Sequence, residues 1–118
     1  MQFCLVIHFS KKQTVLANSA YQFAQKIIQE KHTINCVFFQ YNGADHYIDA
    51  HQNNKTWSTL AQQAGFPLIV CIGSAHQLNI DNKTPHPHFT LGSLSILIEA
   101  IEHADKVVTF PKEVTTYL

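Results

Sequence analysis

The feature that most restricts the fold of this chain is a regular alternation between short apolar runs and segments with helical periodicity. The apolar runs suit buried strands and lie at residues 3–9, 34–41, 67–72 and 107–110, with a very short one at 89–91. Between them, apolar residues recur at spacings of three and four, in the sets Leu16, Ala20, Phe23, Ala24, Ile27, Ile28; Trp57, Leu60, Ala61, Ala64; and Leu94, Leu97, Ile98, Ile101. Such an order implies right-handed crossovers, and we predict an α/β fold whose mostly parallel sheet of about five strands carries helices on both faces.

The connecting segments carry weaker signals. Asn42 and Gly43 break the second strand, and residues 44–55 are polar, which favours a loop with at most a short helical turn. Gly65 stands where the glycine that ends a helix is expected. Residues 79–88 are rich in Asn, Asp and Pro and predict a second loop.

Length and charge exclude several classes of protein. A chain of 118 residues, 46% of them apolar, forms one domain with its own core. Only 14% of residues are charged, so a partner can cover part of the surface. The net charge is zero and the chain has no arginine, which argues against direct contact with nucleic acid or an anionic membrane.

We expect neither a membrane-spanning segment nor a secretion signal in this chain. No apolar run approaches the roughly 18 residues of a membrane helix, and the first residues lack the basic start of a signal peptide. The three cysteines are widely separated and include no C-x-x-C pair, which fits a reducing compartment. We therefore expect a soluble cytoplasmic protein.

In a parallel sheet, function is expected beyond the carboxyl ends of the strands, and Cys71 is the sharpest candidate there. It ends the third strand and precedes Gly73 and Ser74, small residues that can open a helix and leave room for an additional atom on the sulfur. Backbone N–H groups at a helix start stabilise a thiolate. From position alone, a small buried structural cysteine is the competing interpretation.

The other reactive side chains give weaker signals. Cys4 and Cys36 lie inside apolar strands, where burial makes a thiol inert. The eight histidines, including the pair His86 and His88, lack the spacing of a structural zinc site, so we predict no metal and interpret the loop histidines as solvated. His76 follows Cys71 by five residues and is a candidate for tuning its thiol. No G-x-G-x-x-G or P-loop motif appears.

Several segments in order resemble the DsrE family of sulfur-relay proteins, most closely its TusD-like branch. They are residues 1–7, 19–25, 37–39, Trp57, residues 68–75, 89–94 and 105–110. Cys71 falls at the position of the active cysteine of that branch. Where the family often has a basic pair after this cysteine, the chain has His76 and Gln77. The resemblance predicts a DsrE-like domain over residues 1–110 and a C-terminal tail at 111–118.

The resemblance implies a three-layer α/β/α sandwich that assembles with itself or with sibling chains. It implies a sulfurtransferase whose Cys71 accepts a persulfide sulfur from a donor carrier protein and passes it to an acceptor protein, toward 2-thiouridine in tRNA or sulfur oxidation. Gly73, Ser74 and His76 would support Cys71, and no cofactor is required. Two alternatives stay open: a non-catalytic subunit of such an oligomer, which a sealed Cys71 would favour, and a small-ligand or metal-binding α/β module.

Overall fold

The computed structural model describes residues 1–48 and 55–112. Its strands are β1 (Gln2–Ile7), β2 (Thr33–Phe39), β3 (Leu68–Cys71), β4 (Phe89–Gly92) and β5 (Lys106–Phe110). Its helices are α1 (Thr14–Gln29), α2 (Lys55–Ala64), α3 (Ile72–Gln77) and α4 (Leu94–His103), with a 3₁₀ helix, η1 (Tyr41–Tyr47), after β2. The predicted strands and helices are all present, with ends that shift by a residue or two. Gly65 follows α2 with a φ of +78°, as expected of a glycine that ends a helix.

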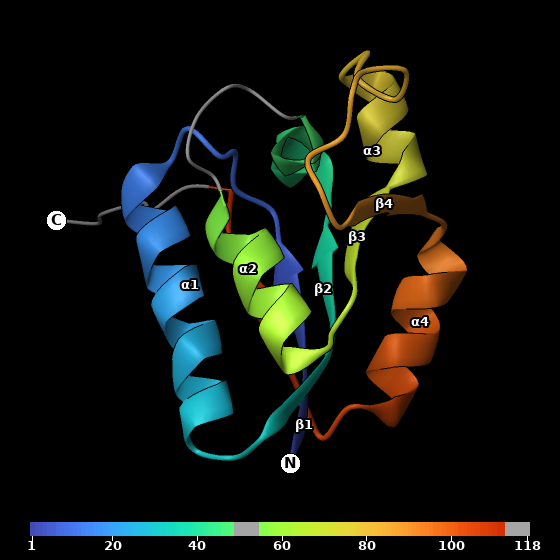
Figure 1. Cartoon of the computed structure of the whole chain (residues 1–118). Coiled ribbons are helices and arrows are strands. Elements are labelled where there is room, and N and C mark those ends of the chain that lie inside the picture. Colours follow the sequence, from blue (N-terminus) through green and yellow to red (C-terminus); the bar gives the residue numbers. More distant parts are fainter. Residues whose placement is uncertain (49–54, 113–118) are drawn as a thin grey trace, which may run out of the picture.

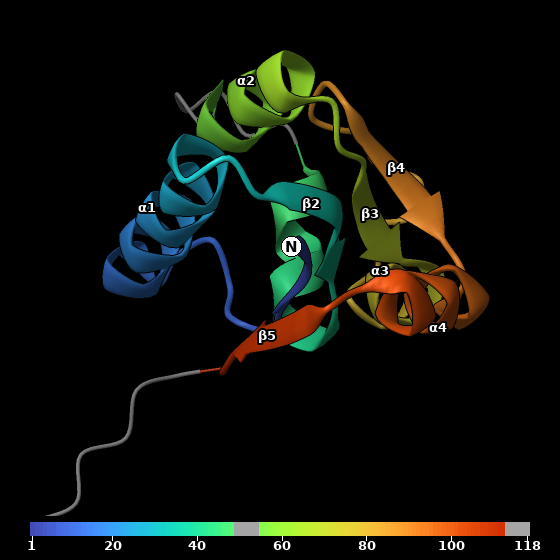
Figure 2. The same ribbon diagram turned by 90° about the horizontal axis from the view of Figure 1, so that it is seen from below.

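All five strands are parallel and follow the order β4-β3-β2-β1-β5 (Figure 1). Helices α1 and α2 cover one face of the sheet and α4 covers the other, as the end-on view in Figure 2 shows. The predicted three-layer sandwich is therefore confirmed. Because all strands are parallel, their carboxyl ends meet at one edge of the sheet, where α3 and η1 pack against each other.

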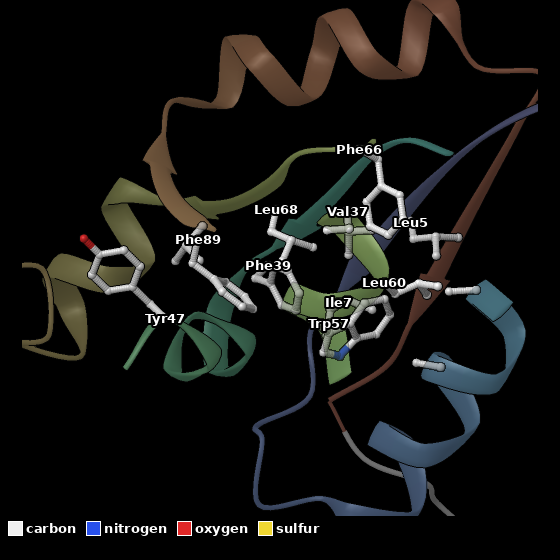
Figure 3. Close-up of a cluster of buried hydrophobic side chains, with 14 of the residues drawn as sticks. Leu5, Ile7, Val37, Phe39, Tyr47, Trp57, Leu60, Phe66, Leu68 and Phe89 are labelled. Carbon is white, nitrogen blue, oxygen red and sulfur yellow. The ribbon is translucent and has the colours of Figure 1, made fainter. Parts of the chain in front are cut away.

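The alternation of side chains along each strand divides the core into two parts. On the face of α1 and α2, Trp57 lies among large apolar side chains from the strands and helices (Figure 3). Its ring contacts those of Phe39 and Tyr21 edge-on, at centroid distances of 6.0 and 5.9 Å. The smaller cluster under α4 contains Leu97 and all three cysteines of the chain. The thiols therefore share one face of the sheet.

One predicted apolar stripe is wrong. Of the set on α4, only Leu97 is buried, whereas Leu94, Ile98 and Ile101 are exposed. The residues that pack beside Leu97 are Ala100 and Ala104. The helix is therefore rotated about its axis relative to the prediction, and the side with Leu97, Ala100 and Ala104 faces the sheet. Leu94, Ile98 and Ile101 form a second apolar line along α4, which is exposed in the single chain.

Parts of two predicted loops lie outside the described residues. The segment 44–55 begins inside η1, a longer helical segment than the predicted turn, and residues 49–54 are not described. Of the tail predicted at 111–118, Pro111 and Lys112 are described and residues 113–118 are not.

Candidate functional site

Cys71 lies where β3 ends and α3 begins. It is the last residue of β3 and the N-cap residue of α3, so the first free backbone N–H groups of that helix are next to it. The residue is 7% exposed, against 0% for Cys4 and 2% for Cys36. Burial raises the pKa of Cys4 to about 11 and that of Cys36 to about 12, the latter also through the neighbouring Cys4. Both are thiols at neutral pH.

Two glycines shape the surroundings of Cys71. A Cβ atom built on Gly73 would lie 3.9 Å from the Cys71 sulfur, and Gly73 is itself exposed, so the thiol is covered by no side chain at that position. Gly92 is the β4 partner of Cys71. A Cβ atom there would come within 2.5 Å of Cγ2 of Ile69 and 2.8 Å of Cδ1 of Ile96. Gly92 thus lets β4 and α4 pack closely beside β3.

Ser74 connects the helix that carries Cys71 to η1. It is buried, and its Oγ accepts a hydrogen bond of 2.8 Å from the backbone N–H of Tyr41. Tyr41 has a φ of +55°, which is uncommon for a bulky residue. The hydroxyl therefore helps to hold η1 against α3, a contact that the sequence does not reveal because the two residues are 33 positions apart.

His76 occupies the last turn of α3, five residues beyond Cys71. That separation corresponds to about 7 Å along a helix axis. The imidazole is well exposed, and its Nδ1 lies 3.2 Å from Oδ2 of Asp81. The structure thus brings Gly73 next to the sulfur and engages His76 with a carboxylate at the other end of the helix.

Two histidines in polar segments are buried, so the expectation that the loop histidines are solvated is wrong for them. His86 lies 2.9 Å from Oγ of Ser58, and Ser58 donates to the carbonyl of Pro87. The hydroxyl of Ser58 has one proton, which it gives to this carbonyl, so in the contact with His86 the Ser58 oxygen accepts and the His86 Nδ1–H donates. His46 packs between the rings of Phe9 and Phe39. Burial inside the fold, which depends on residues distant in sequence, overrides the polarity of the local segment.

Within residues 1–48 and 55–112, no group of three or more His, Cys, Asp or Glu residues is arranged to hold a metal ion. Over the same ranges, none of the helices combines the length and the apolar character needed to cross a bilayer.

Comparisons with known proteins connect this arrangement to a family. The sequence model of the DsrE/DsrF-like family matches residues 1–110. DsrE of Allochromatium vinosum is 31% identical over 93% of this chain and 98% of its own. The sulfurtransferase TusD of Klebsiella pneumoniae is 30% identical over 93% of this chain and its full length. The crystal structure of the ychN protein from E. coli superposes with a TM-score of 0.75 at 17% identity, over 93% of this chain and all of that one.

Proposed function

The chain belongs to the DsrE/DsrF-like family, and on that premise we propose that it is a sulfurtransferase of a sulfur relay that carries sulfur as a persulfide on Cys71. The observation that carries the assignment to Cys71 is its position. It is the thiol at the carboxyl edge of the sheet, beside a helix start and an exposed glycine, whereas Cys4 and Cys36 lie inside strands with raised pKa values.

The reaction consists of two thiol exchanges at the outer sulfur of a persulfide. The Cys71 thiolate attacks the outer sulfur of the donor persulfide, an S–S bond forms, and the donor leaves as a thiolate with the electrons of the broken S–S bond. An acceptor thiolate then attacks the outer sulfur on Cys71 and releases the Cys71 thiolate. The sulfur changes carrier without net oxidation, so neither a metal nor an organic cofactor is needed.

The partners follow from this chemistry. Cys71 receives sulfur from a donor carrier protein and passes it to an acceptor protein thiol, on a route toward tRNA 2-thiouridine or sulfur oxidation. Zero net charge and the absence of arginine support protein partners, with any RNA left to a later enzyme. We place the reaction in the cytoplasm, on the domain formed by residues 1–110.

We further propose that the working form is an oligomer, of this chain alone or with sibling chains. The support is the α4 face, which we define as Leu94, Ile98 and Ile101, each between 42% and 58% exposed. An apolar line on a helix is normally covered by another part of the protein or by a partner. Contiguous exposed apolar surface marks interfaces between proteins, and obligate interfaces are the more apolar ones.

A second candidate is a structural subunit of such an oligomer that transfers no sulfur. The observation that favours it is the burial of Cys71, which is only 7% exposed in the single chain. Transfer requires that a donor reach the sulfur, and Gly73 places no side chain over it. The two candidates therefore differ in whether Cys71 exchanges sulfur in the folded protein.

The test is to load the protein with sulfur and locate the adduct. The folded protein is incubated with a cysteine desulfurase and its carrier without reductant, then digested and weighed by mass spectrometry. We expect the mass of one added sulfur on the peptide that contains Cys71, removable by reductant, in the parent and in the control Cys36→Ala. Cys71→Ala should show none. A parent that stays unmodified while the desulfurase loads its carrier would favour the structural subunit.

A further inference from the structure

The connections of the sheet diverge between β1 and β5. From β1 the chain continues to β2, β3 and β4 on one side, and from β4, the outermost strand on that side, it crosses back to β5 on the other side of β1. In open α/β sheets, ligands bind outside the carboxyl ends of the strands at such a point. The two strand ends are held together by a 3.0 Å hydrogen bond from the His8 N–H to the Phe110 carbonyl. The residues that follow β1 and β5 therefore lie close together, at the carboxyl ends of the strands.

Positively charged residues follow both strands. Lys11 and Lys12 come after β1, and Lys112 comes after β5, so three of the eight lysines of the chain gather at this place. The first turn of α1, which follows Lys12, contains no acidic residue. Among the residues that the structure describes, two carboxylates lie at this end of the sheet, and both are engaged. Asp45 accepts from the Ser10 hydroxyl and the Lys11 N–H, and Asp81 faces His76. Within residues 1–48 and 55–112, the three lysines outnumber these two carboxylates.

Tyr41 connects these lysines to the helix that begins at Cys71. Its backbone N–H is bonded to Ser74 of α3. On its other side, the ring lies 4.7 Å from the His8 ring, and the Lys112 ammonium lies 5.5 Å above it. The side chain is 49% exposed although its backbone is in the left-handed region. An uncommon backbone conformation that displays a large aromatic ring at the functional edge suits a contact surface.

We infer that the lysine–tyrosine surface, defined as Lys11, Lys12, Lys112 and Tyr41, docks an acidic segment of the protein that exchanges sulfur with Cys71. The inference rests on the proposed function. In the strand order, β3 is two strands from β1 and three from β5. These steps amount to about 10 to 14 Å, which three or four extended residues span. The acidic residues of the partner therefore lie three or four positions from its reactive cysteine.

Charge complementarity favours an acidic peptide over RNA. Three lysines and one exposed aromatic ring suit a short run of carboxylates beside an apolar side chain. The chain has no arginine, and its zero net charge supplies no wider basic surface along which a phosphate backbone could run. RNA is accordingly the competing occupant in the test.

The experiment uses synthetic peptides as probes of the full chain. One carries a cysteine persulfide with three glutamates beginning four residues away, and a matched peptide carries three glutamines. Rates of persulfide formation on Cys71 are measured by quenched mass spectrometry. The test variant is K11Q/K12Q/K112Q. The control K26Q/K31Q/K106Q removes the same charge from the opposite edge of the sheet, at the end of α1 and the start of β5.

We expect the glutamate peptide to react about tenfold faster than the glutamine peptide, because the contributions of three exposed ion pairs combine. In 0.5 M salt the two rates should become similar, because salt screens these ion pairs. This ratio should fall toward one in the test variant and persist in the control. Equal rates from the two peptides, or a ratio that the test variant retains, would overturn the docking surface while leaving the proposed function intact.

A binding assay separates the two ideas if no peptide transfers sulfur. Fluorescence anisotropy follows the glutamate peptide with serine in place of cysteine, and a labelled single-stranded RNA of equal charge. If no sulfur is transferred but the peptide binds, and binds more weakly to the test variant, the sulfurtransferase proposal is refuted and the acidic docking surface stands. No binding, or RNA binding tighter than the peptide, would overturn the docking surface.

Discussion

Lowering the pH should destabilise the protein through His46 in the 3₁₀ helix η1. Its imidazole is 1% exposed and lies between the rings of Phe9 and Phe39. Nε2 donates to the Phe9 carbonyl at 3.3 Å, and Nδ1 has no hydrogen-bond partner among the described residues. Burial lowers the pKa of His46 from 6.5 to about 4, more strongly than the nearby Asp45 charge raises it. The folded state therefore keeps this ring neutral.

The sign and size of the effect follow from proton linkage. Below pH 6.5 the unfolded chain protonates His46 and the folded chain does not, so stability is complete above that pH and is lost as the pH falls toward 4. Between pH 8 and pH 4.5, the two pKa values give a loss of about 2.5 kcal/mol in the free energy of unfolding. That is a large part of the stability of a small domain.

The assay is urea unfolding at a series of pH values, with the parent and His46→Gln. Glutamine keeps a donor for the Phe9 carbonyl and does not titrate, while all other titrating groups are shared. We expect the parent to lose about 2.5 kcal/mol more than the variant over this range. Parallel pH profiles for the two proteins would show that His46 is not a buried neutral imidazole and would refute the reasoning.

Three further predictions concern the site and the α4 face. Iodoacetamide at pH 8 should alkylate Cys71 well before Cys4 and Cys36, because raised pKa values of about 11 and about 12 leave few thiolates; equal labelling would contradict this. Gly73→Leu should slow alkylation of Cys71 with little loss of melting temperature, since leucine favours a helix; an unchanged rate would mean that reagents do not approach past this residue. Ile98→Glu should place a charge on the α4 face and shift sedimentation to smaller species. A parent protein that sediments as a stable monomer, both alone and with sibling chains, would contradict the proposed oligomer.

The parts of the fold that the sequence predicts are those whose signals are local. The five strands are short apolar runs, and the end of α2 is marked by Gly65, whose positive φ requires no knowledge of the rest of the chain. Cys71 could be selected in the same way, because the end of a strand in a parallel sheet is readable from the order of elements.

The parts that the sequence does not predict depend on contacts between distant residues. Periodicity shows that α4 is apolar but not which side packs, since that depends on how the helix crosses the sheet beneath Leu97. The bond from Tyr41 to Ser74, and that from His86 to Ser58, join residues 33 and 28 positions apart. Such pairs arise only when the layers assemble, so local polarity wrongly placed His86 in solvent.

The central claim, that Cys71 receives sulfur and passes it on, is tested most directly by following one labelled sulfur atom through the protein. The parent, Cys71→Ser and Cys36→Ala are loaded with ³⁵S from a desulfurase and carrier, freed of donor, and mixed with an acceptor thiol. The parent and Cys36→Ala should bind one label and release it to the acceptor, and Cys71→Ser should do neither, because an alcohol cannot hold a persulfide. If folded Cys71→Ser transferred label as well as the parent, Cys71 would not be the carrier.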